Sequence, residues 1–294
     1  MLSLTVDEAL QRASFNLKKA GVEDAPVEAE ILLSYVLKKN RLQLYLCKQD
    51  LLPRVSHDIF LDLVERRSKG EPSAYITGHK YFYGRPFRVD RRVLIPRPET
   101  ELIVERSLCF AEECKNNGIA NLSILDLGTG SGVLAVTLAL EIIDAEVWAV
   151  DLSAEALEVA RLNANDNKVN KRIAWLEGDY FHAVKGTSAG KDFNLIVSNP
   201  PYLSAKDMEN LPPGIKEYEP ASALYGGPDG LEGYRQIIKK APSFIKTPCK
   251  LIVEIGSSQE EEVTRILEAA GLFSEIKCHP DLAGLPRVVE AHIS

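Results

Sequence analysis

The sequence predicts an α/β protein with a seven-stranded mixed sheet and helices on both faces, preceded by a small all-α domain. From residue 121 onward, apolar strands alternate with helical segments, which is typical of a parallel sheet covered by helices. The last two strands, near 273–278 and 287–293, have no helix between them, so we expect an antiparallel pair at the sheet edge. Residues 1–70 show only helical spacing of apolar positions.

The composition is that of a globular protein. Of the 294 residues, 45% are hydrophobic and 26% are charged, as in ordinary folded domains. The net charge of −7 argues against a broad nucleic-acid footprint. None of the five cysteines forms a C-x-x-C pair, so we expect neither a disulfide framework nor a metal site. Because there is no signal peptide and no apolar run of membrane length, we expect a cytoplasmic protein.

The helical domain, residues 1–70, opens with a capping-box pattern in which Glu8 follows Thr5 by three positions. Gly21 ends this first helix. Further helices are expected at 26–37 and 56–68, with a short segment at 41–46 between them. No residue here carries obvious chemistry, so the domain either holds a macromolecular partner or caps the fold.

Residues 71–97 form a connector. Aromatic and β-branched residues surround a Gly-Arg-Pro turn at 84–86, which predicts a β-hairpin. Arg97 stands between Pro96 and Pro98, so its backbone is held rigidly. Two roles are open for Arg97: it forms a structural ion pair, or it belongs to the floor of an active site and contacts the substrate.

The remaining residues, 98–294, form the α/β domain. Its strands are expected at 123–127, 146–150, 173–177, 193–198, 249–255, 273–278 and 287–293. Its helices are expected at 99–116, 133–140, 154–165, 231–246 and 258–270. Residues 203–230 are predicted as a long loop.

The fourth of these strands runs into Asn199-Pro200-Pro201-Tyr202. The two prolines end the strand and place Asn199 at its carboxyl end, where open α/β sheets bind ligands. The Asn199 amide oxygen and a rigid backbone carbonyl can accept the two hydrogens of a planar NH2 group, while the Tyr202 ring covers its face. The alternative is a structural turn that only ends the strand.

A glycine-rich loop, Gly128-Thr129-Gly130-Ser131-Gly132, follows the first strand. Its glycines permit a sharp turn and the close approach of a nucleotide-like ligand. The spacing differs from the G-x-G-x-x-G of dinucleotide binders, and no Lys-Ser/Thr follows as in a Walker A loop. Asp126, which precedes the loop, can pair with an ammonium group rather than a pyrophosphate.

Three acidic or aromatic residues follow the next two strands. Asp151 ends the second strand, where an acid accepts both ribose hydroxyls. A ligand with a ribose and a cationic amino-acid tail, and without phosphates, is S-adenosylmethionine. Asp179 and Tyr180 follow the third strand and are placed to flank the adenine, although a turn or helix cap is the alternative for Asp179.

Together, the glycine loop, Asp126, Asp151 and the Asn-Pro-Pro-Tyr motif resemble class I S-adenosylmethionine-dependent methyltransferases that act on amino groups. Further stretches resemble, more narrowly, the peptide chain release factor glutamine methyltransferases, the PrmC/HemK family. These stretches are Gly70-Glu71-Pro72, Ile95-Pro96-Arg97-Pro98-Glu99-Thr100-Glu101, Glu219-Pro220, Gly226-Gly227-Pro228-Asp229-Gly230-Leu231, Glu254-Ile255-Gly256 and Asp281-Leu282-Ala283-Gly284-Leu285-Pro286-Arg287. The likeness covers essentially the whole chain.

The resemblance implies a Rossmann-like methyltransferase fold and a defined reaction. These enzymes methylate the side-chain amide nitrogen of the glutamine in the Gly-Gly-Gln motif of class 1 release factors, converting S-adenosylmethionine to S-adenosylhomocysteine. By the resemblance, Asn199 and the Pro200 carbonyl take the amide hydrogens and Tyr202 packs on the amide, while Pro201 and Arg97 complete the substrate site. The residues expected to hold the cofactor are Asp126, Gly128, Thr129, Gly130, Ser131, Gly132, Asp151, Asp179, Tyr180 and Asn199. A release factor is the expected partner of a monomeric enzyme.

Two other functions remain open on the sequence. Adenine in DNA and guanine in rRNA also present an NH2 group, so the motif alone does not exclude a nucleic-acid methyltransferase. The net charge of −7 and the lack of a separate basic domain count against it. A non-catalytic S-adenosylmethionine-binding module is the other alternative, and the intact Asn-Pro-Pro-Tyr motif counts against that. A dehydrogenase is disfavoured by the spacing of the glycine loop.

Overall fold

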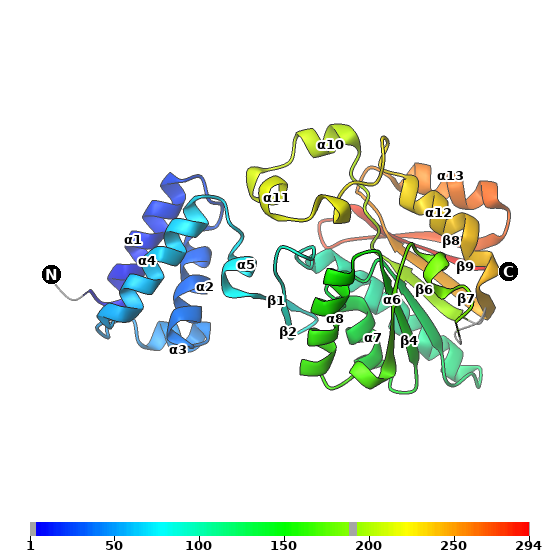
Figure 1. The fold of residues 1–294 in the computed structure, drawn as a ribbon, viewed down its shortest axis with the longest axis horizontal. Helices are drawn as coiled ribbons and strands as arrows, with labels where there is room; N and C mark the ends of the chain where they lie inside the picture. Colours follow the sequence, from blue (N-terminus) through cyan, green and yellow to red (C-terminus); the bar gives the residue numbers. More distant parts are fainter. Residues whose placement is uncertain (1–3, 188–192, 294) are drawn as a thin grey trace. The chain divides into compact units, whose positions relative to one another are not determined.

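A computed structural model describes residues 4–187 and 193–293, and these form two compact units. The first unit runs to His79 and also includes Pro212–Tyr218; the second holds Lys80–Leu211 and the chain from Glu219 onward. The first unit is helical (blue to cyan in Figure 1, with α11 in yellow), whereas the second carries the large sheet. The glycine loop and the Asn-Pro-Pro-Tyr motif both lie in the second unit.

The first unit consists of helices that bury their apolar faces in a core of their own. Its helices are α1 Val6–Lys19, α2 Ala25–Leu37, α3 Arg41–Leu46, α4 Arg54–Ser68, α5 Ser73–Thr77 and α11 Pro213–Tyr218. The predicted capping box is confirmed, because Thr5 Oγ1 accepts from Glu8 N at 3.2 Å and Glu8 Oε2 accepts from Thr5 N at 2.8 Å. Leu17, Leu32 and Phe60 are fully buried in this core.

The second unit is built on the predicted seven-stranded mixed sheet. The strand order is β5-β4-β3-β6-β7-β9-β8; the first five strands are parallel, and β9 is antiparallel to both β7 and β8. The strands are β3 Ser123–Leu127, β4 Glu146–Asp151, β5 Ile173–Glu177, β6 Phe193–Ser198, β7 Ile245–Glu254, β8 Phe273–Pro280 and β9 Pro286–Ile293. A separate two-stranded sheet, β1 His79–Phe82 with β2 Arg85–Arg88, confirms the predicted hairpin. Its turn is Tyr83-Gly84 rather than 84–86, because Arg85 and Pro86 belong to β2.

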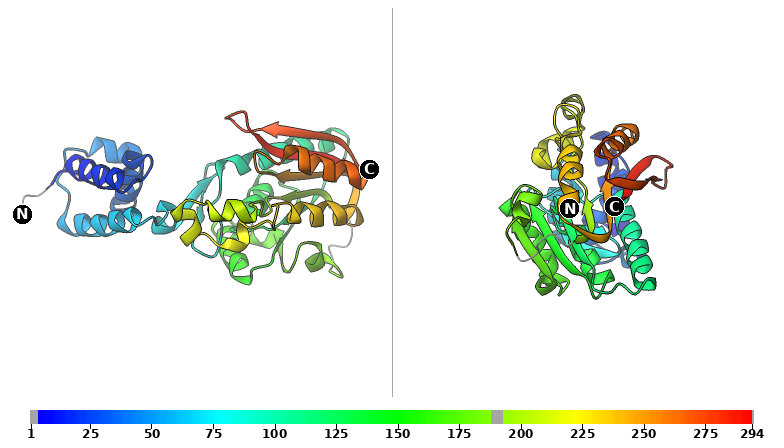
Figure 2. Two further views of the ribbon diagram at one scale, coloured as in Figure 1. Left: turned by 90° about the horizontal axis from the view of Figure 1, so that it is seen from above. Right: turned by 90° about the vertical axis from the view of Figure 1, so that its right-hand side faces the viewer.

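Helices cover both faces of the large sheet because alternate residues of each strand point to opposite sides. Ile124 joins one buried core with helices α6 Glu101–Asn116 and α7 Val133–Glu141. Leu125, the next residue, joins the other core with α12 Glu232–Lys240 and α13 Glu260–Ala270. Figure 2 shows helices on either side of the sheet. The other helices of this unit are α8 Ala154–Asp166, α9 Phe181–Val184 and α10 Ala205–Glu209.

The parallel register brings the carboxyl ends of four strands together on the same side of the sheet. Leu127 of β3 pairs with Val150 of β4 and Ser198 of β6, and Ser198 pairs in turn with Val253 of β7. The residues that follow these are Gly128, Asp151, Asn199 and Glu254. Strands β3 and β6 flank the point where the strand order reverses, which is where open α/β sheets bind ligands.

Some element boundaries differ from the sequence prediction. The predicted loop 203–230 contains α10 and α11. A Ser204–Asp207 capping box begins α10, and Pro213 opens α11. The predicted helix 231–246 ends at Lys240, because Pro242 cannot continue an α-helix, and the chain passes through a 3₁₀ turn into β7. Helix α5 and the short α9 were not expected from the sequence.

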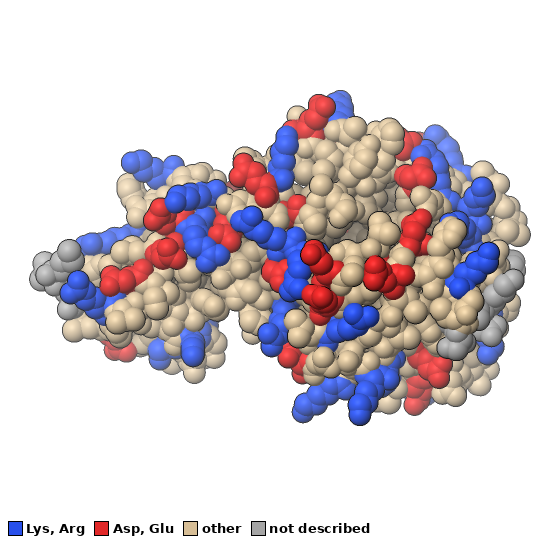
Figure 3. Space-filling model, in the orientation of Figure 1, with Lys and Arg blue, Asp and Glu red and all other residues tan. Residues whose placement is uncertain are grey.

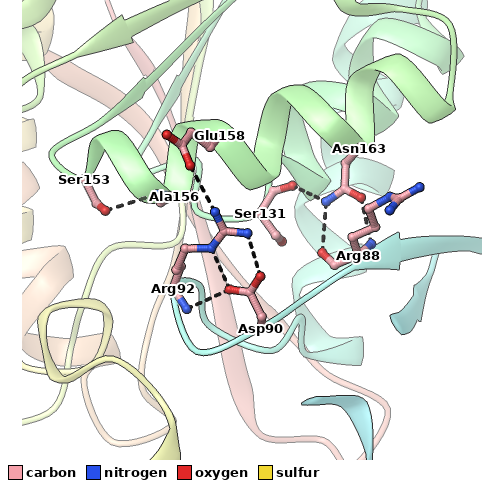
Figure 4. A network of polar contacts seen from close by, with 8 residues as sticks. All are labelled: Arg88, Asp90, Arg92, Ser131, Ser153, Ala156, Glu158 and Asn163. Atoms are coloured by element: carbon pink, nitrogen blue, oxygen red, sulfur yellow. Dashed lines mark hydrogen bonds and ion pairs between the residues drawn. The ribbon is translucent and has the colours of Figure 1, made fainter. Parts of the chain in front are cut away.

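A buried asparagine on α8 ties the hairpin to the glycine loop (Figure 4). Asn163 Nδ2 donates to the carbonyl oxygens of Ser131 at 2.8 Å and Arg88 at 3.0 Å. Its Oδ1 accepts from Arg88 N at 2.7 Å. Asn163 is 1% exposed, so water cannot replace these bonds. The amide therefore holds the end of the glycine loop against strand β2.

Asn163→Ala is expected to lower the free energy of unfolding by about 2–4 kcal/mol, because it leaves buried backbone groups without partners. Urea denaturation followed by circular dichroism measures this change. Asn165→Ala, at an exposed position of the same helix, is the matched control and should change stability by less than about 0.5 kcal/mol. Equal stabilities of the two variants would contradict the structural role given to Asn163.

Candidate active site

The Asn-Pro-Pro-Tyr segment leaves the sheet at the end of β6. Ser198, the last residue of β6, donates from its hydroxyl to the Leu127 carbonyl at 2.6 Å, which fixes β6 to the end of β3. Asn199 is half-buried at the sheet edge. No described residue donates a hydrogen bond to its Oδ1 or to the Pro200 carbonyl. Two acceptors thus stand together at the end of β6.

Two glycines lie directly against this segment because nothing larger fits. A Cβ atom on Gly226 would lie 2.4 Å from the Pro201 carbonyl oxygen, and one on Gly230 would lie 2.4 Å from that of Tyr202. Gln259, just before α13, adds side-chain hydrogen bonds: its Nε2 donates to the carbonyls of Tyr202 at 3.0 Å and Gly230 at 3.2 Å. The segment is therefore held in place by backbone packing and by the half-buried amide of Gln259.

Asn199 is also held from the other side, through its amide nitrogen. Nδ2 donates to Thr100 Oγ1 at 3.2 Å, and the Thr100 hydroxyl donates to Glu254 Oε2 at 2.6 Å. Thr100 ends the 3₁₀ helix η1 Pro98–Thr100, and Glu254 ends β7. Thr100 is 3% exposed and Glu254 is 1% exposed. These two hydrogen bonds use the amide nitrogen of Asn199 and leave its amide oxygen free to accept a hydrogen bond from a ligand.

The glycine loop turns sharply between β3 and α7. Gly128 N and Thr129 N both donate to the Val150 carbonyl at 2.9 Å, and Gly130 N donates to Asp151 Oδ2 at 2.7 Å. Cβ atoms built on Gly128 or Gly130 would meet nothing within 4 Å. The loop is thus tied to β4 on one side and open on the other, with room for a ligand to reach its backbone.

Asp126 lies beneath the loop. Its Oδ2 accepts from Thr129 Oγ1 at 2.6 Å and from Ala135 N at 3.1 Å. Its Oδ1 is buried and has no hydrogen-bond partner among the described residues. Burial raises the pKa of Asp126 to about 7. A cationic group is the partner that this orphaned carboxylate oxygen lacks, so the residues present fit the ammonium of S-adenosylmethionine.

Asp151 is held at the end of β4 by two backbone amides. Besides Gly130 N, Ser153 N donates to its Oδ1 at 2.9 Å. Burial raises the pKa of Asp151, and these hydrogen bonds act in the opposite direction. Each carboxylate oxygen keeps a further lone pair for a ligand hydroxyl.

The two residues predicted to flank an adenine lie differently. Asp179 is exposed, and its side chain caps no described helix. Tyr180 is half-buried and has a positive φ of 43°, a conformation that non-glycine residues rarely adopt. A Cβ atom on Gly233 of α12 would lie 3.0 Å from the Tyr180 hydroxyl and 3.1 Å from Pro200 Cβ. Tyr180 and the Asn-Pro-Pro-Tyr segment therefore meet at the start of α12.

Of the two roles open for Arg97, the structure shows the ion pair. Arg97 Nη2 lies 2.6 Å from Glu219 Oε1, and the Ile95 amide donates to Glu219 Oε2 at 3.1 Å. The Glu219 side chain is 1% exposed. The pair joins the proline-rich segment to the chain before η3 Ala221–Ala223. A substrate contact of Arg97 remains a prediction.

The sequence motifs did not reveal several residues that build this site. Thr100, Gln259, Glu254 and Asn163 act through contacts between segments far apart in the chain. Gly226, Gly230, Thr100 and Glu254 lay in stretches noted only for their resemblance to a family. A glycine-rich stretch such as Gly-Gly-Pro-Asp-Gly after a ligand-binding motif is a signal for such close packing.

The surface of the second unit offers no broad basic area on the visible face. Lys and Arg side chains are interspersed there with Asp and Glu (Figure 3). Within residues 4–187 and 193–293, no group of three or more His, Cys, Asp or Glu side chains could hold a metal ion. Across the same residues, no helix is both long and apolar enough to span a membrane.

Comparison with known families assigns both parts of the chain. A model of the PrmC N-terminal domain matches residues 8–78, and a model of the methyltransferase small domain matches residues 107–211. Among solved structures, the hMettl16 catalytic domain in complex with the MAT2A 3′UTR hairpin 6 has a TM-score of 0.54 and 13% identity. The match covers 78% of this chain and 81% of that one. At this identity it supports the methyltransferase fold alone.

Relatives match along almost the whole chain. A release factor glutamine methyltransferase of Chlorobaculum tepidum is 39% identical over 266 residues, which is 90% of each chain. One of Bacillus anthracis is 36% identical over 290 residues, covering 99% of this chain and 100% of the relative. The strand order and the sequence motifs agree with these matches. The chain therefore belongs to the release factor glutamine methyltransferase family of S-adenosylmethionine-dependent methyltransferases.

Proposed function

We propose that this protein transfers a methyl group from S-adenosylmethionine to the side-chain amide nitrogen of the glutamine in the Gly-Gly-Gln motif of class 1 release factors. The observation that carries the proposal is the full-length match to release factor glutamine methyltransferases at 36–39% identity. The two acceptors at Asn199 and Pro200 support it, because a glutamine NH2 group brings two hydrogens to be accepted.

The partner of the reaction is then a release factor, and the enzyme acts on it in the cytoplasm as a monomer. The helical unit provides the surface that binds this partner. It exposes several large apolar side chains that a partner can cover on binding. They include Phe15, Leu42, Tyr45, Leu46 and Val55.

The cofactor is proposed to lie over the glycine loop. When bound, S-adenosylmethionine supplies a methyl group on a positively charged sulfur. The open faces of Gly128 and Gly130 admit the ligand to the loop backbone, and Asp126 Oδ1 accepts from its ammonium. Asp151 accepts from the ribose hydroxyls. Tyr180 and the exposed Asp179 flank the adenine.

The Asn-Pro-Pro-Tyr segment is proposed to position the glutamine. Asn199 Oδ1 and the Pro200 carbonyl accept the two amide hydrogens, and Tyr202 packs on the amide plane, with Pro201 fixing the turn between them. These contacts turn the nitrogen lone pair out of conjugation and aim it at the methyl carbon. No His or Cys lies beside the motif, so positioning is the main contribution, and the proton lost from nitrogen goes to water.

Methyl-labelled S-adenosylmethionine tests the substrate. The protein is incubated separately with a release factor, with that factor's Gln→Ala variant in the Gly-Gly-Gln motif, with unmethylated DNA and with rRNA. Label on the release factor, absent from the variant, is the expected result. Label on either nucleic acid alone would overturn the release-factor assignment.

Asn199→Ala is expected to lower kcat by about 10²–10³-fold, because it removes a preorganised acceptor at the reacting nitrogen. The dissociation constant for S-adenosylhomocysteine should stay within about threefold, since the cofactor contacts lie mainly in the glycine loop. Steady-state kinetics and calorimetry measure the two effects, with Asn165→Ala as control. Equal losses of turnover and cofactor affinity would contradict this division of roles.

Cofactor affinity is expected to fall as pH falls below about 7. The carboxylate form of Asp126 binds the ammonium. Because the pKa of Asp126 is about 7, the carboxyl is mostly protonated at lower pH and must lose this proton before the ammonium binds. The dissociation constant should rise by up to about tenfold per pH unit below that value. Calorimetry from pH 7.5 to 5.5 measures it. The Asp126→Asn variant should bind more weakly and without this pH dependence, and a flat wild-type profile would argue against the ammonium contact.

A further inference from the structure

The Thr100 hydroxyl lies between two side chains and has only one proton to donate. Glu254 Oε2 is 2.6 Å away, and Asn199 Nδ2 is 3.2 Å away. A distance of 2.6 Å is typical of a hydroxyl that donates to a carboxylate. Having given its proton to Glu254, Thr100 can only accept from Asn199. The carboxylate therefore decides, through one hydroxyl, which end of the Asn199 amide faces away from Thr100.

We propose that Thr100 and Glu254 are positioning residues that keep the Asn199 amide oxygen, rather than its NH2 group, turned toward the substrate. This proposal rests on the role proposed above for Asn199 as an acceptor of the glutamine hydrogens. An Asn199 amide turned by 180° would present its own NH2 group to the substrate NH2 group, and two donors cannot bond each other.

Both residues are anchored well enough to hold this orientation. Thr100 follows the rigid Pro96-Arg97-Pro98 segment, and its amide donates to the Arg97 carbonyl at 3.2 Å. The Tyr234 hydroxyl donates to the Glu254 carbonyl at 2.9 Å. Neither Thr100 nor Glu254 can readily exchange its partner for water, because both are almost fully buried.

The orientation depends on the charge of Glu254. The charged and titratable groups around it are Arg287 on β9, Arg97 and Glu99 before α6, Tyr202 after β6 and Tyr234 on α12. Burial raises the pKa of Glu254 to about 7, while the Thr100 hydrogen bond and the two arginines act in the opposite direction. Once protonated, Glu254 can donate to Thr100, whose own proton then turns to Asn199 and favours the opposite amide orientation.

The Thr100→Val variant removes the hydroxyl at nearly constant volume, and Thr100→Ser keeps it. We expect Thr100→Val to lower kcat by about 10–100-fold, as for a misplaced catalytic contact. Thr100→Ser should retain kcat within about threefold. Both variants should bind S-adenosylhomocysteine like the wild type. Equal losses in the two variants, or an unchanged kcat in Thr100→Val, would overturn the proposal.

The pH profile separates positioning from packing. At saturating cofactor, the wild-type kcat should fall below about pH 7 by up to tenfold per pH unit, because Glu254 becomes protonated. Saturation removes the effect of Asp126 on cofactor affinity. Glu254→Gln keeps the shape of the side chain and should abolish this pH dependence. A Glu254→Gln profile that still falls as the wild type does would contradict the role of Glu254.

A readout that needs no substrate distinguishes this proposal from the proposed function. In protein with ¹⁵N-labelled asparagine side chains, the Asn199 NH2 signal should shift with a midpoint near pH 7 in the wild type and stay fixed in Glu254→Gln. If this shift is seen but release factors are not methylated, the proposed function fails and the hydrogen-bond chain stands. If the signal does not respond to pH, the proposed control of the Asn199 orientation by Thr100 and Glu254 is wrong, whatever the substrate is.

Discussion

The parallel register of β4, β3, β6 and β7 is the constraint on which the site depends. It places the ends of four strands at the same level, so that Asp151, the glycine loop, Asn199 and Glu254 meet at one edge of the sheet. A shift by one residue would turn each strand's buried side chains to the opposite face. The two cores on the faces of the sheet therefore fix the site as well as the stability.

Buried carboxylates organise this edge in a common way. Asp126 accepts hydrogen bonds from the glycine loop and keeps one oxygen without a partner, while Glu254 accepts from Thr100 behind Asn199. Burial disfavours the charged form and raises the pKa of both carboxyl groups, while these hydrogen bonds act in the opposite direction. The arrangement holds the loops in one geometry before any ligand binds, as preorganised active sites require.

The sequence predicts the parts of this structure that depend on local chemistry. Prolines after β6 end a strand, apolar strands that alternate with helical segments give the sheet, and Thr5 with Glu8 begins a helix. The rest depends on contacts between distant segments. Thr100 and Glu254 are 154 positions apart, and Asn163 is 75 positions from Arg88, so no local pattern pairs them. Two boundary errors could have been avoided from local signals. The Ser204 capping box marks a helix inside the predicted loop 203–230, and Pro242 marks the end of the predicted helix 231–246.

Locating the transferred methyl group within the product tests the proposed reaction most directly. A release factor incubated with the enzyme and S-adenosylmethionine is digested, and the peptide with the Gly-Gly-Gln motif is fragmented in a mass spectrometer. We expect one added methyl group on the glutamine side-chain nitrogen, and its near-absence when Asn199→Ala replaces the wild type. A methyl group on any other residue, or an equal yield from the variant, would contradict the proposal.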